Sequence, residues 1–425
     1  MQRKNSKYRD IINILNEELV PATGCTEPVA LAYASAKARE VLDVYPDSSR
    51  VELSGNIIKN VKSVIVPNTG GMRGVGAAVA AGIIAGNPAK ILEVLSDIRE
   101  ADKPRIKAYQ ETHDIQIVPY EGDLVFYISV TVRAGNSYAK VVIENYHTNV
   151  VLVEKDGNIL FQPGTTSNSV QVTDRGILNV KDIVAFADIV ELTDIADVVG
   201  RQIAYNSAIA ADGLNNDWGA NIGKILLRTY GDDVKVRARA LAAAGSDARM
   251  GGCEKPVIIL SGSGNQSLAA SLPVIEYAKD LGVSQDRLYR AVVLADLMTI
   301  YQKTSIGRLS AFCGAVSAGC AAGAGIAYLC GGGYDAIAHT VVNALAIVSG
   351  IVCDGAKPSC AAKIAAAVDA GMIGYSMVQN GQQFCSGDGI ITRGVDNTIA
   401  NVGRIASEGM RETDREIIKI MVECR

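Results

Sequence analysis

The chain has 425 residues, enough to bury a large core as two domains or as one elaborated domain. Its 41 basic and 45 acidic side chains give a formal net charge of −4, which offers no basic surface for nucleic acid. Nine cysteines occur at irregular spacings, unlike a disulfide framework, and no signal peptide is recognisable at the first residues. We therefore expect a cytoplasmic protein in a reducing compartment.

The first candidate for a reactive group is a turn between two predicted helices, residues 4–19 and a run ending near Val44. The turn has the sequence PATGCTEP at residues 21–28, in which Thr26 is suited to cap the second helix. Cys25 then lies just outside a helix N-terminus, where the positive end of the helix dipole favours thiolate over thiol. Cys25 is a candidate base or nucleophile, and a small buried turn residue is the alternative.

Residues 46–165 are predicted to form an α+β subdomain inserted into a helical domain of residues 1–45 and 166–425. Strands are expected at 51–54 and 63–66, helices near 72–86, 88–94 and 98–110, and an antiparallel meander between 115 and 162. His113 and His147 fall in this block without metal-ligand neighbours. Both are predicted to be surface side chains or to have their hydrogen bonds satisfied.

Two glycine-rich turns are candidates for binding an anion. The first, PNTGGMRG at residues 67–74, opens a helix, and its candidate substrate-binding residues are Asn68, Thr69 and Arg73. The second, SGSGNQS at residues 261–267, follows a short apolar run and also opens a helix. Its hydroxyl and amide groups suit a small carboxylate, so Ser261, Ser263 and Asn265 are further candidates. Ordinary helix capping is the alternative for the second turn.

The chain is predicted to be almost entirely helical beyond residue 173. One segment, residues 309–334, carries no charge and is long enough to cross a bilayer. It consists mainly of small residues, and Gly319 and Gly323 give a face on which another helix can pack closely. We expect a central buried helix here and no membrane span.

Three cysteines are candidate ligands of an iron–sulfur cluster. Cys353 and Cys360 lie on either side of a turn that contains Pro358, so Cys353 is expected to end one helix and Cys360 to begin the next. Cys313 lies upstream in the apolar segment. A structural zinc site is not expected because no close cysteine pair has the required spacing, whereas a cubane cluster accepts cysteines from distant helices. Burial as a small hydrophobic residue is the alternative for each.

Six stretches resemble the L-cysteine desulfidase family, relatives of the iron–sulfur L-serine dehydratase alpha chain. They are PATGCTEP (21–28), PNTGG (67–71), SGSGNQ (261–266), CGA (313–315), CDGAKPSCA (353–361) and SGDGI (386–390), and the resemblance extends along essentially the whole chain. It implies a [4Fe-4S] enzyme without pyridoxal phosphate that converts L-cysteine to pyruvate, ammonia and hydrogen sulfide. It also implies that Cys313, Cys353 and Cys360 hold the cluster, that the fourth iron is open, and that Cys25 is the acid/base residue.

Several alternatives stay open at this point. The same site would serve an L-serine dehydratase, and a non-catalytic iron–sulfur redox sensor is an alternative of another class, although a sensor needs no base such as Cys25. A pyridoxal-phosphate lyase is a weaker alternative, because no lysine has a recognisable Schiff-base context. The expected partner is a small amino acid, and the oligomeric state is open, with a homodimer as one option. Lys357, Cys385 and Cys424 have no assigned role, and Cys253, Cys320 and Cys330 are assigned to packing.

Overall fold

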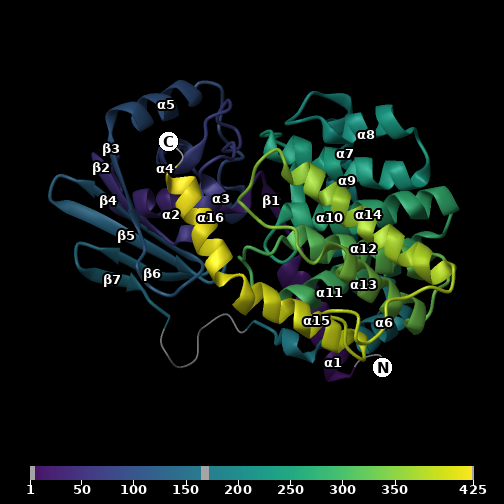
Figure 1. The fold of residues 1–425 in the computed structure, drawn as a ribbon. Coiled ribbons are helices and arrows are strands. Elements are labelled where there is room, and N and C mark those ends of the chain that lie inside the picture. The colour runs from purple at the N-terminus through teal and green to yellow at the C-terminus, as the bar shows by residue number, and fades with distance from the viewer. Residues whose placement is uncertain (1–4, 164–171, 424–425) are drawn as a thin grey trace.

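The computed structural model describes residues 5–163 and 172–423 and has two parts side by side, a sheet part and a helical part (Figure 1). The sheet part comes from the first half of the chain. The helical part contains the first helix and most of the chain after residue 172. The predicted fold class, mainly helical with an inserted α+β region, is confirmed.

The sheet part contains one six-stranded sheet in the order β3-β2-β4-β5-β6-β7. Its strands are β2 (Ser48–Leu53), β3 (Asp114–Pro119), β4 (Tyr127–Ala134), β5 (Ser137–Glu144), β6 (Val150–Lys155) and β7 (Asn158–Phe161). Its helices are α2 (Thr26–Leu42), α3 (Gly55–Val61), α4 (Gly74–Ala85), the 3₁₀-helix η1 (Pro88–Glu93) and α5 (Lys103–Thr112). The sheet is mixed rather than antiparallel, because β2 and β3 run parallel and are joined by a crossover through the helices.

Helix α2 packs against β4, β5 and α4, and most of its side chains are buried. The approach to α4 is close at Gly82, where a Cβ would lie 2.3 Å from the carbonyl oxygen of Ala32. The predicted domain division stays a prediction, because α2 packs with the sheet and the boundary at residue 165 lies outside the described residues. Residues 63–66 form an isolated bridge, Ile65 with Arg73, instead of the predicted strand.

The helical part begins with α1 (Ser6–Glu18) and resumes after residue 172. Its further helices are the 3₁₀-helix η2 (Arg175–Ile177), α6 (Val180–Ile189), α7 (Leu192–Asn215), α8 (Ile222–Tyr230), α9 (Val234–Met250), α10 (Gly264–Leu281), α11 (Gln285–Ile306), α12 (Gly314–Leu329), α13 (Tyr334–Val348), α14 (Cys360–Gln379) and α15 (Val395–Arg404). A π-helical turn, η3 (Ile405–Gly409), leads into α16 (Arg411–Glu423), which crosses back to the sheet part and packs against α3 (Figure 1).

Helix α12 is the predicted central helix, and every residue from Ala315 to Leu329 is buried. It packs against α10, α11, α13 and α14. Its glycines allow the helix backbones to touch, because a Cβ at Gly319 would lie 2.3 Å from the carbonyl carbon of Ala367 in α14. A Cβ at Gly323 would lie 2.5 Å from the carbonyl oxygen of Gly371. Small residues therefore set the distance between α12 and α14.

Helix α14 is long and apolar enough by composition to cross a membrane, and half of this stretch is buried inside the protein. It packs against α9, α12 and α13, as a core helix does.

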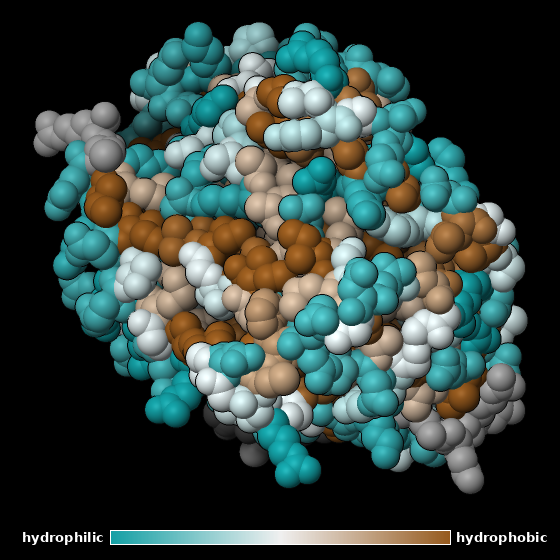
Figure 2. Space-filling model, turned by 45° about the vertical axis from the view of Figure 1, so that its right-hand side comes forward, coloured by the Kyte–Doolittle hydropathy of each residue, from teal (hydrophilic) through white to brown (hydrophobic). Residues whose placement is uncertain are grey.

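Figure 2 shows hydrophobic side chains gathered in a band on the face where the helical part comes forward. Exposed apolar side chains such as Ile347 and Ile373 belong to the helical part. The oligomeric state stays open, with a homodimer as one option.

We expect Gly319→Ala to lower the free energy of unfolding by about 1–3 kcal/mol or more, because the new methyl group meets backbone atoms that cannot rotate away. Denaturant unfolding followed by circular dichroism measures the change. Gly333→Ala is the matched control, since a Cβ at Gly333 meets nothing within 4 Å among the described residues. Equal stability of the two variants would contradict the close contact.

A buried acid lies in the core beside α12. Asp296 of α11 accepts a hydrogen bond from the Gln202 amide at 2.9 Å, and its second carboxyl oxygen has no partner among the described residues. Burial raises the pKa of Asp296 from 3.8 to about 8, and the bond from Gln202 opposes this only in part. The carboxyl group is therefore mostly protonated at neutral pH.

The folded state binds this proton more tightly than the unfolded chain does. Stabilisation by the protonated form is complete below about pH 4 and is lost as the pH rises to about 8. We therefore expect the wild-type protein to lose stability relative to Asp296→Asn between those two values. Thermal unfolding of both proteins across the range measures this, and a stability difference independent of pH would contradict the assignment.

Candidate active site

A cavity of about 100 Å³ lies where the sheet part and the helical part meet. Seven predicted site residues line it: Cys25, Ser261, Ser263, Asn265, Cys313, Cys353 and Cys360. The cavity adjoins a cleft of about 1240 Å³ that is bordered by α16, and the two share lining residues such as Lys303 and Arg308. The structure thus brings together residues that are more than three hundred positions apart in the sequence.

A short two-stranded sheet joins the Cys25 turn to the helical part. Strand β1 (Val20–Thr23) pairs antiparallel with β8 (Pro256–Ile259). Gly24, at φ 67°, follows β1 and is so close to Pro67 that a Cβ would lie 2.8 Å from the proline ring. Cys25 rather than Thr26 is the N-cap of α2, and the Thr26 hydroxyl instead donates to the Gly262 carbonyl oxygen at 2.9 Å.

The Cys25 side chain is buried and donates a hydrogen bond to Glu27 at 3.1 Å. Burial raises the pKa of Cys25 well above its usual value, the negative charge of Glu27 raises it further, and the charge of Arg249 opposes the change. The side chain of Cys25 is therefore a thiol at rest, whereas its position at a helix N-terminus predicted a thiolate. Loss of water and a facing carboxylate outweigh the helix dipole at this position.

Glu27 and His147 extend the site beyond Cys25. His147 follows β5, and its Nε2 atom lies 3.7 Å from a carboxylate oxygen of Glu27. Asn60 donates to the same oxygen at 3.2 Å. Burial raises the pKa of Glu27, but His147 and the Cys25 thiol stabilise the charged form, and the net effect is a pKa of about 2. Glu27 is thus an ionised, buried carboxylate.

The prediction for His147 was wrong. The side chain is 5% exposed and lines the cavity, and its Nε2 atom has no hydrogen-bond partner among residues 5–163 and 172–423. Its ring packs edge-on against Phe126. Nothing local in the sequence distinguishes His147 from a surface residue, because the fold alone brings the turn after β5 to the helical part. His113 lies elsewhere and stacks on Tyr109.

The three candidate ligand cysteines come from three separate positions. Cys313 is the N-cap of α12, and Cys360 is the first residue of α14, as predicted. Cys353 does not end a helix, because α13 stops at Val348. Instead, an isolated bridge between Phe312 and Val352 aligns the two segments, with the Cys353 amide donating to the Ala311 carbonyl oxygen at 2.6 Å.

These thiols lie near one another in a buried environment. Burial raises the pKa of Cys313 to about 12, and the negative charge of Cys353 as thiolate adds to the effect. Burial also lowers the pKa of Lys303 to about 8, while the charges of Cys353 and Cys313 oppose that change. Lys59, also buried, forms an ion pair with Asp414 of α16 at 2.6 Å.

The residues around the cavity fit an anionic cluster better than a single metal ion. No group of three His, Cys, Asp or Glu side chains in the described ranges is close enough to hold one ion. A cubane is larger than one ion, so its thiolate ligands lie further apart. Four cationic side chains line the cavity, Lys59, Arg249, Lys303 and Arg308, and Glu27 is its acidic side chain. Their positive charge suits thiolates and a bound anion.

The second glycine-rich turn lies at the cavity, beside Arg249, for which the sequence predicted no role. Ser261 and Gly262 have positive φ, and Ser263 is the N-cap of α10. Arg249, in the last turn of α9, is 2% exposed and donates from Nη1 to the Asn265 side-chain oxygen at 3.1 Å. An arginine at the end of an ordinary helix pattern gives no sequence signal of this contact.

The first glycine-rich turn lies outside the cavity. Asn68 donates to the Leu95 carbonyl oxygen and Thr69 to the Val66 carbonyl oxygen, both at 2.7 Å. Arg73 donates to the Ser63 carbonyl oxygen at 3.2 Å. These side chains hold the turn together instead of lining the cavity, and the turn supports the Gly24 position through Pro67.

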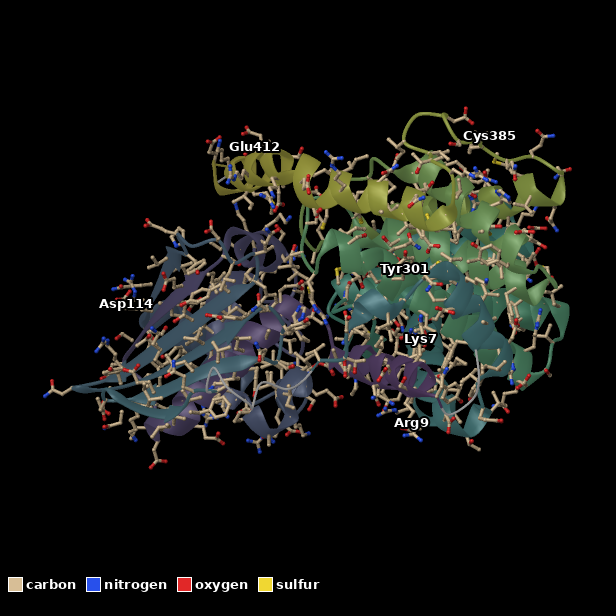
Figure 3. All side chains as sticks on the ribbon, turned by 90° about the horizontal axis from the view of Figure 1, so that it is seen from below. Lys7, Arg9, Asp114, Tyr301, Cys385 and Glu412 are labelled. Atoms are coloured by element: carbon tan, nitrogen blue, oxygen red, sulfur yellow. The ribbon has the colours of Figure 1, made fainter. Side chains whose placement is uncertain are left out.

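The remaining candidates that the structure describes do not line the cavity. Lys357 forms an ion pair with Asp354. Cys385 is on an exposed loop at the outer edge of the helical part, far from the junction of the two parts (Figure 3). Cys330 is exposed, so its assignment to packing was wrong, whereas Cys253 and Cys320 are buried as predicted. Cys424 lies outside the described residues.

Residues 89–419 match the family model described as "Serine dehydratase alpha chain". The chain belongs to this family. It is 57% identical over 423 residues to a UPF0597 protein of Desulfitobacterium hafniense, covering 99% of this chain and 98% of that protein. UPF0597 proteins of Lachnoclostridium phytofermentans and Treponema denticola are 49% and 44% identical, with at least 98% of each chain covered. The resemblance found in the sequence is thus confirmed at the level of the family.

We expect Glu27→Gln to make Cys25 react at least about threefold faster with iodoacetamide between pH 8 and 9, because loss of the nearby negative charge favours the thiolate. Mass spectrometry of the Cys25 peptide, in protein without iron, measures the rate. Glu40→Gln, an exposed position on the same helix, is the control. An unchanged or slower reaction in Glu27→Gln would contradict the electrostatic assignment.

Proposed function

We propose that the protein catalyses β-elimination of L-cysteine to pyruvate, ammonia and hydrogen sulfide without pyridoxal phosphate. The observation that carries the proposal is one cavity lined both by the buried thiol of Cys25 and by the three cysteines Cys313, Cys353 and Cys360. Membership of the serine dehydratase alpha chain family supports a lyase of this type. The small volume of the cavity supports a small substrate.

Cys313, Cys353 and Cys360 would hold a [4Fe-4S] cluster whose fourth iron is open. When bound, the cluster supplies a Lewis acid for the leaving sulfur of the substrate. The cationic side chains Lys59 and Lys303 balance negative charge at this end of the cavity. Burial of Cys313 keeps water from its thiol.

Cys25 accepts the α-proton in the proposed reaction. It must first pass the proton that it donates to Glu27 to water in the adjoining cleft, and the charge of Arg249 favours that loss by lowering the pKa of Cys25. The electrons of the broken C–H bond form the Cα–Cβ double bond as the C–S bond breaks. The sulfur leaves with the electrons of that bond as hydrosulfide, takes up the proton now on Cys25 and is released as hydrogen sulfide. The aminoacrylate tautomerises to an imine, and water hydrolyses it to pyruvate and ammonia. His147 and Asn60 hold Glu27 in place beside Cys25.

Deamination of L-serine is the second candidate, and the description of the matching family model favours it. The residues of the cavity serve both reactions, since a hydroxyl replaces the thiol as leaving group. A non-catalytic sensor is the alternative of another class. The Cys25, Glu27 and His147 cluster argues against a sensor, because such a protein needs no buried proton acceptor.

The experiment that tests the proposal is anaerobic reconstitution with iron and sulfide, followed by removal of free sulfide and assay of pyruvate from L-cysteine and L-serine. We expect cluster-dependent pyruvate and sulfide from L-cysteine and slow reaction of L-serine. Preference for L-serine would replace the first candidate by the second. Turnover of neither amino acid by protein that carries a cluster would contradict both.

We expect Cys25→Ser to lower kcat by at least about a hundredfold while the visible absorption of the reconstituted cluster stays unchanged, because the variant loses the proton acceptor but keeps the proposed ligands. Cys330→Ser, an exposed cysteine outside the cavity, is the control and should keep wild-type activity. Wild-type kcat in Cys25→Ser would rule out the assigned role.

The proposal includes a cytoplasmic location, where reducing conditions keep thiols available for a cluster. The cysteines that the structure describes are all free of disulfide bonds, which supports such a compartment.

We also propose a homodimer. Light scattering on the reconstituted protein measures its mass.

A further inference from the structure

Arg249 is a buried cation with unused hydrogen-bonding capacity. Its side chain lines the cavity and is 2% exposed. One nitrogen, Nη1, donates to Asn265, whereas Nε and Nη2 are buried without a hydrogen-bond partner anywhere in the described part of the chain. A buried guanidinium group with free N–H donors is unfavourable unless an anion compensates it.

The guanidinium group lies directly against the first turn of α10. A Cβ at Gly264, the first residue of this helix, would lie 2.5 Å from Arg249 Nε and 2.9 Å from Cζ. The first backbone N–H groups of a helix have no partner within the helix, and they carry the positive end of its dipole. Gly264 therefore lets a side-chain cation and a helix N-terminus meet at one point of the cavity.

The acidic side chain at the cavity does not supply the missing anion. Glu27 accepts hydrogen bonds from Cys25, Thr26 and Asn60 and forms an ion pair with His147, so other described residues already engage its carboxylate. Arg249 remains close enough to Cys25 for its charge to lower the pKa of that thiol. An anion beside Arg249 would thus lie within reach of the proposed proton acceptor.

We propose that Arg249 and the first turn of α10 bind the α-carboxylate of the substrate. The planar guanidinium group matches a carboxylate in geometry, and its two free nitrogens are suited to a paired contact. Held there, the substrate presents its α-hydrogen towards Cys25 and its side chain towards the three cysteines. The substrate class is therefore small amino acids with a free carboxylate, which excludes amines that lack one. Naming this anion as a substrate group rests on the proposed function.

Calorimetric binding to the anaerobically reconstituted protein tests the proposal with two thiol probes. The first, 3-mercaptopropionate, carries a carboxylate, and the second, cysteamine, has an amine and no carboxylate. We expect the wild-type protein to bind 3-mercaptopropionate at least about tenfold more tightly. Arg249→Gln should weaken binding of 3-mercaptopropionate by at least about thirtyfold and change cysteamine binding by less than about threefold.

Arg239→Gln is the matched control, because Arg239 is on the same helix, pairs with Asp369 and does not line the cavity. It should bind both probes as the wild type does. Equal binding of the two probes by the wild-type protein would overturn the proposal and needs no variant to fold. Equal weakening of both probes in Arg249→Gln would also overturn it.

The outcome for the carboxylate site is separable from that for the proposed reaction. Carboxylate-selective binding that depends on Arg249, in protein that releases no pyruvate from either amino acid, would support the anion site and contradict the β-elimination. Turnover of L-cysteine with unchanged KM in Arg249→Gln would support the reaction and overturn the anion site.

Discussion

Several charged groups are buried around one small cavity, and their burial determines how the site is built. Arg249, Lys303 and Glu27 are almost completely shielded from water, and each must be compensated inside the protein. Glu27 has four polar neighbours, Cys25, Thr26, Asn60 and His147. Arg249 donates from Nη1 to Asn265, whereas its Nε and Nη2 atoms have no hydrogen-bond partner among the described residues. This excess of positive charge makes the cavity suited to thiolates and to an anionic substrate.

Close backbone contacts hold these groups in place. Gly264 allows Arg249 to lie on the first turn of α10, and a Cβ at Gly262 would lie 2.9 Å from atoms of both His147 and Arg308. Gly355, between two of the candidate ligand cysteines, approaches the backbone of Lys59. The site is thus assembled across the junction of the two parts, and α16 ties the parts together through Asp414 and Lys59.

The sequence predicted the features that depend on local pattern. The buried helix α12 follows from its small, uncharged residues, and the start of α14 at Cys360 follows from the turn before it. Contacts between segments distant in the sequence were not predicted: β3 lies parallel to β2, and the residue before Cys353 forms a bridge with Phe312.

The missed parts of the site depend on tertiary structure. His147 and Arg249 occupy ordinary positions in their own elements, so nothing local marks them as cavity residues. The protonation state of Cys25 was mispredicted because the sequence shows a helix N-terminus but not the burial or the orientation of Glu27. The turn at Asn68 has the composition of an anion site, yet its polar groups are used within the turn and its surroundings.

The iron and acid-labile sulfide content of the anaerobically reconstituted protein and of its cysteine variants tests directly whether Cys313, Cys353 and Cys360 hold a cluster. We expect about four iron and four sulfide per wild-type chain. Cys353→Ser should lose most of both, while Cys330→Ser should retain them. Full retention in Cys353→Ser, or a wild-type protein that assembles no cluster, would contradict the proposed cluster site.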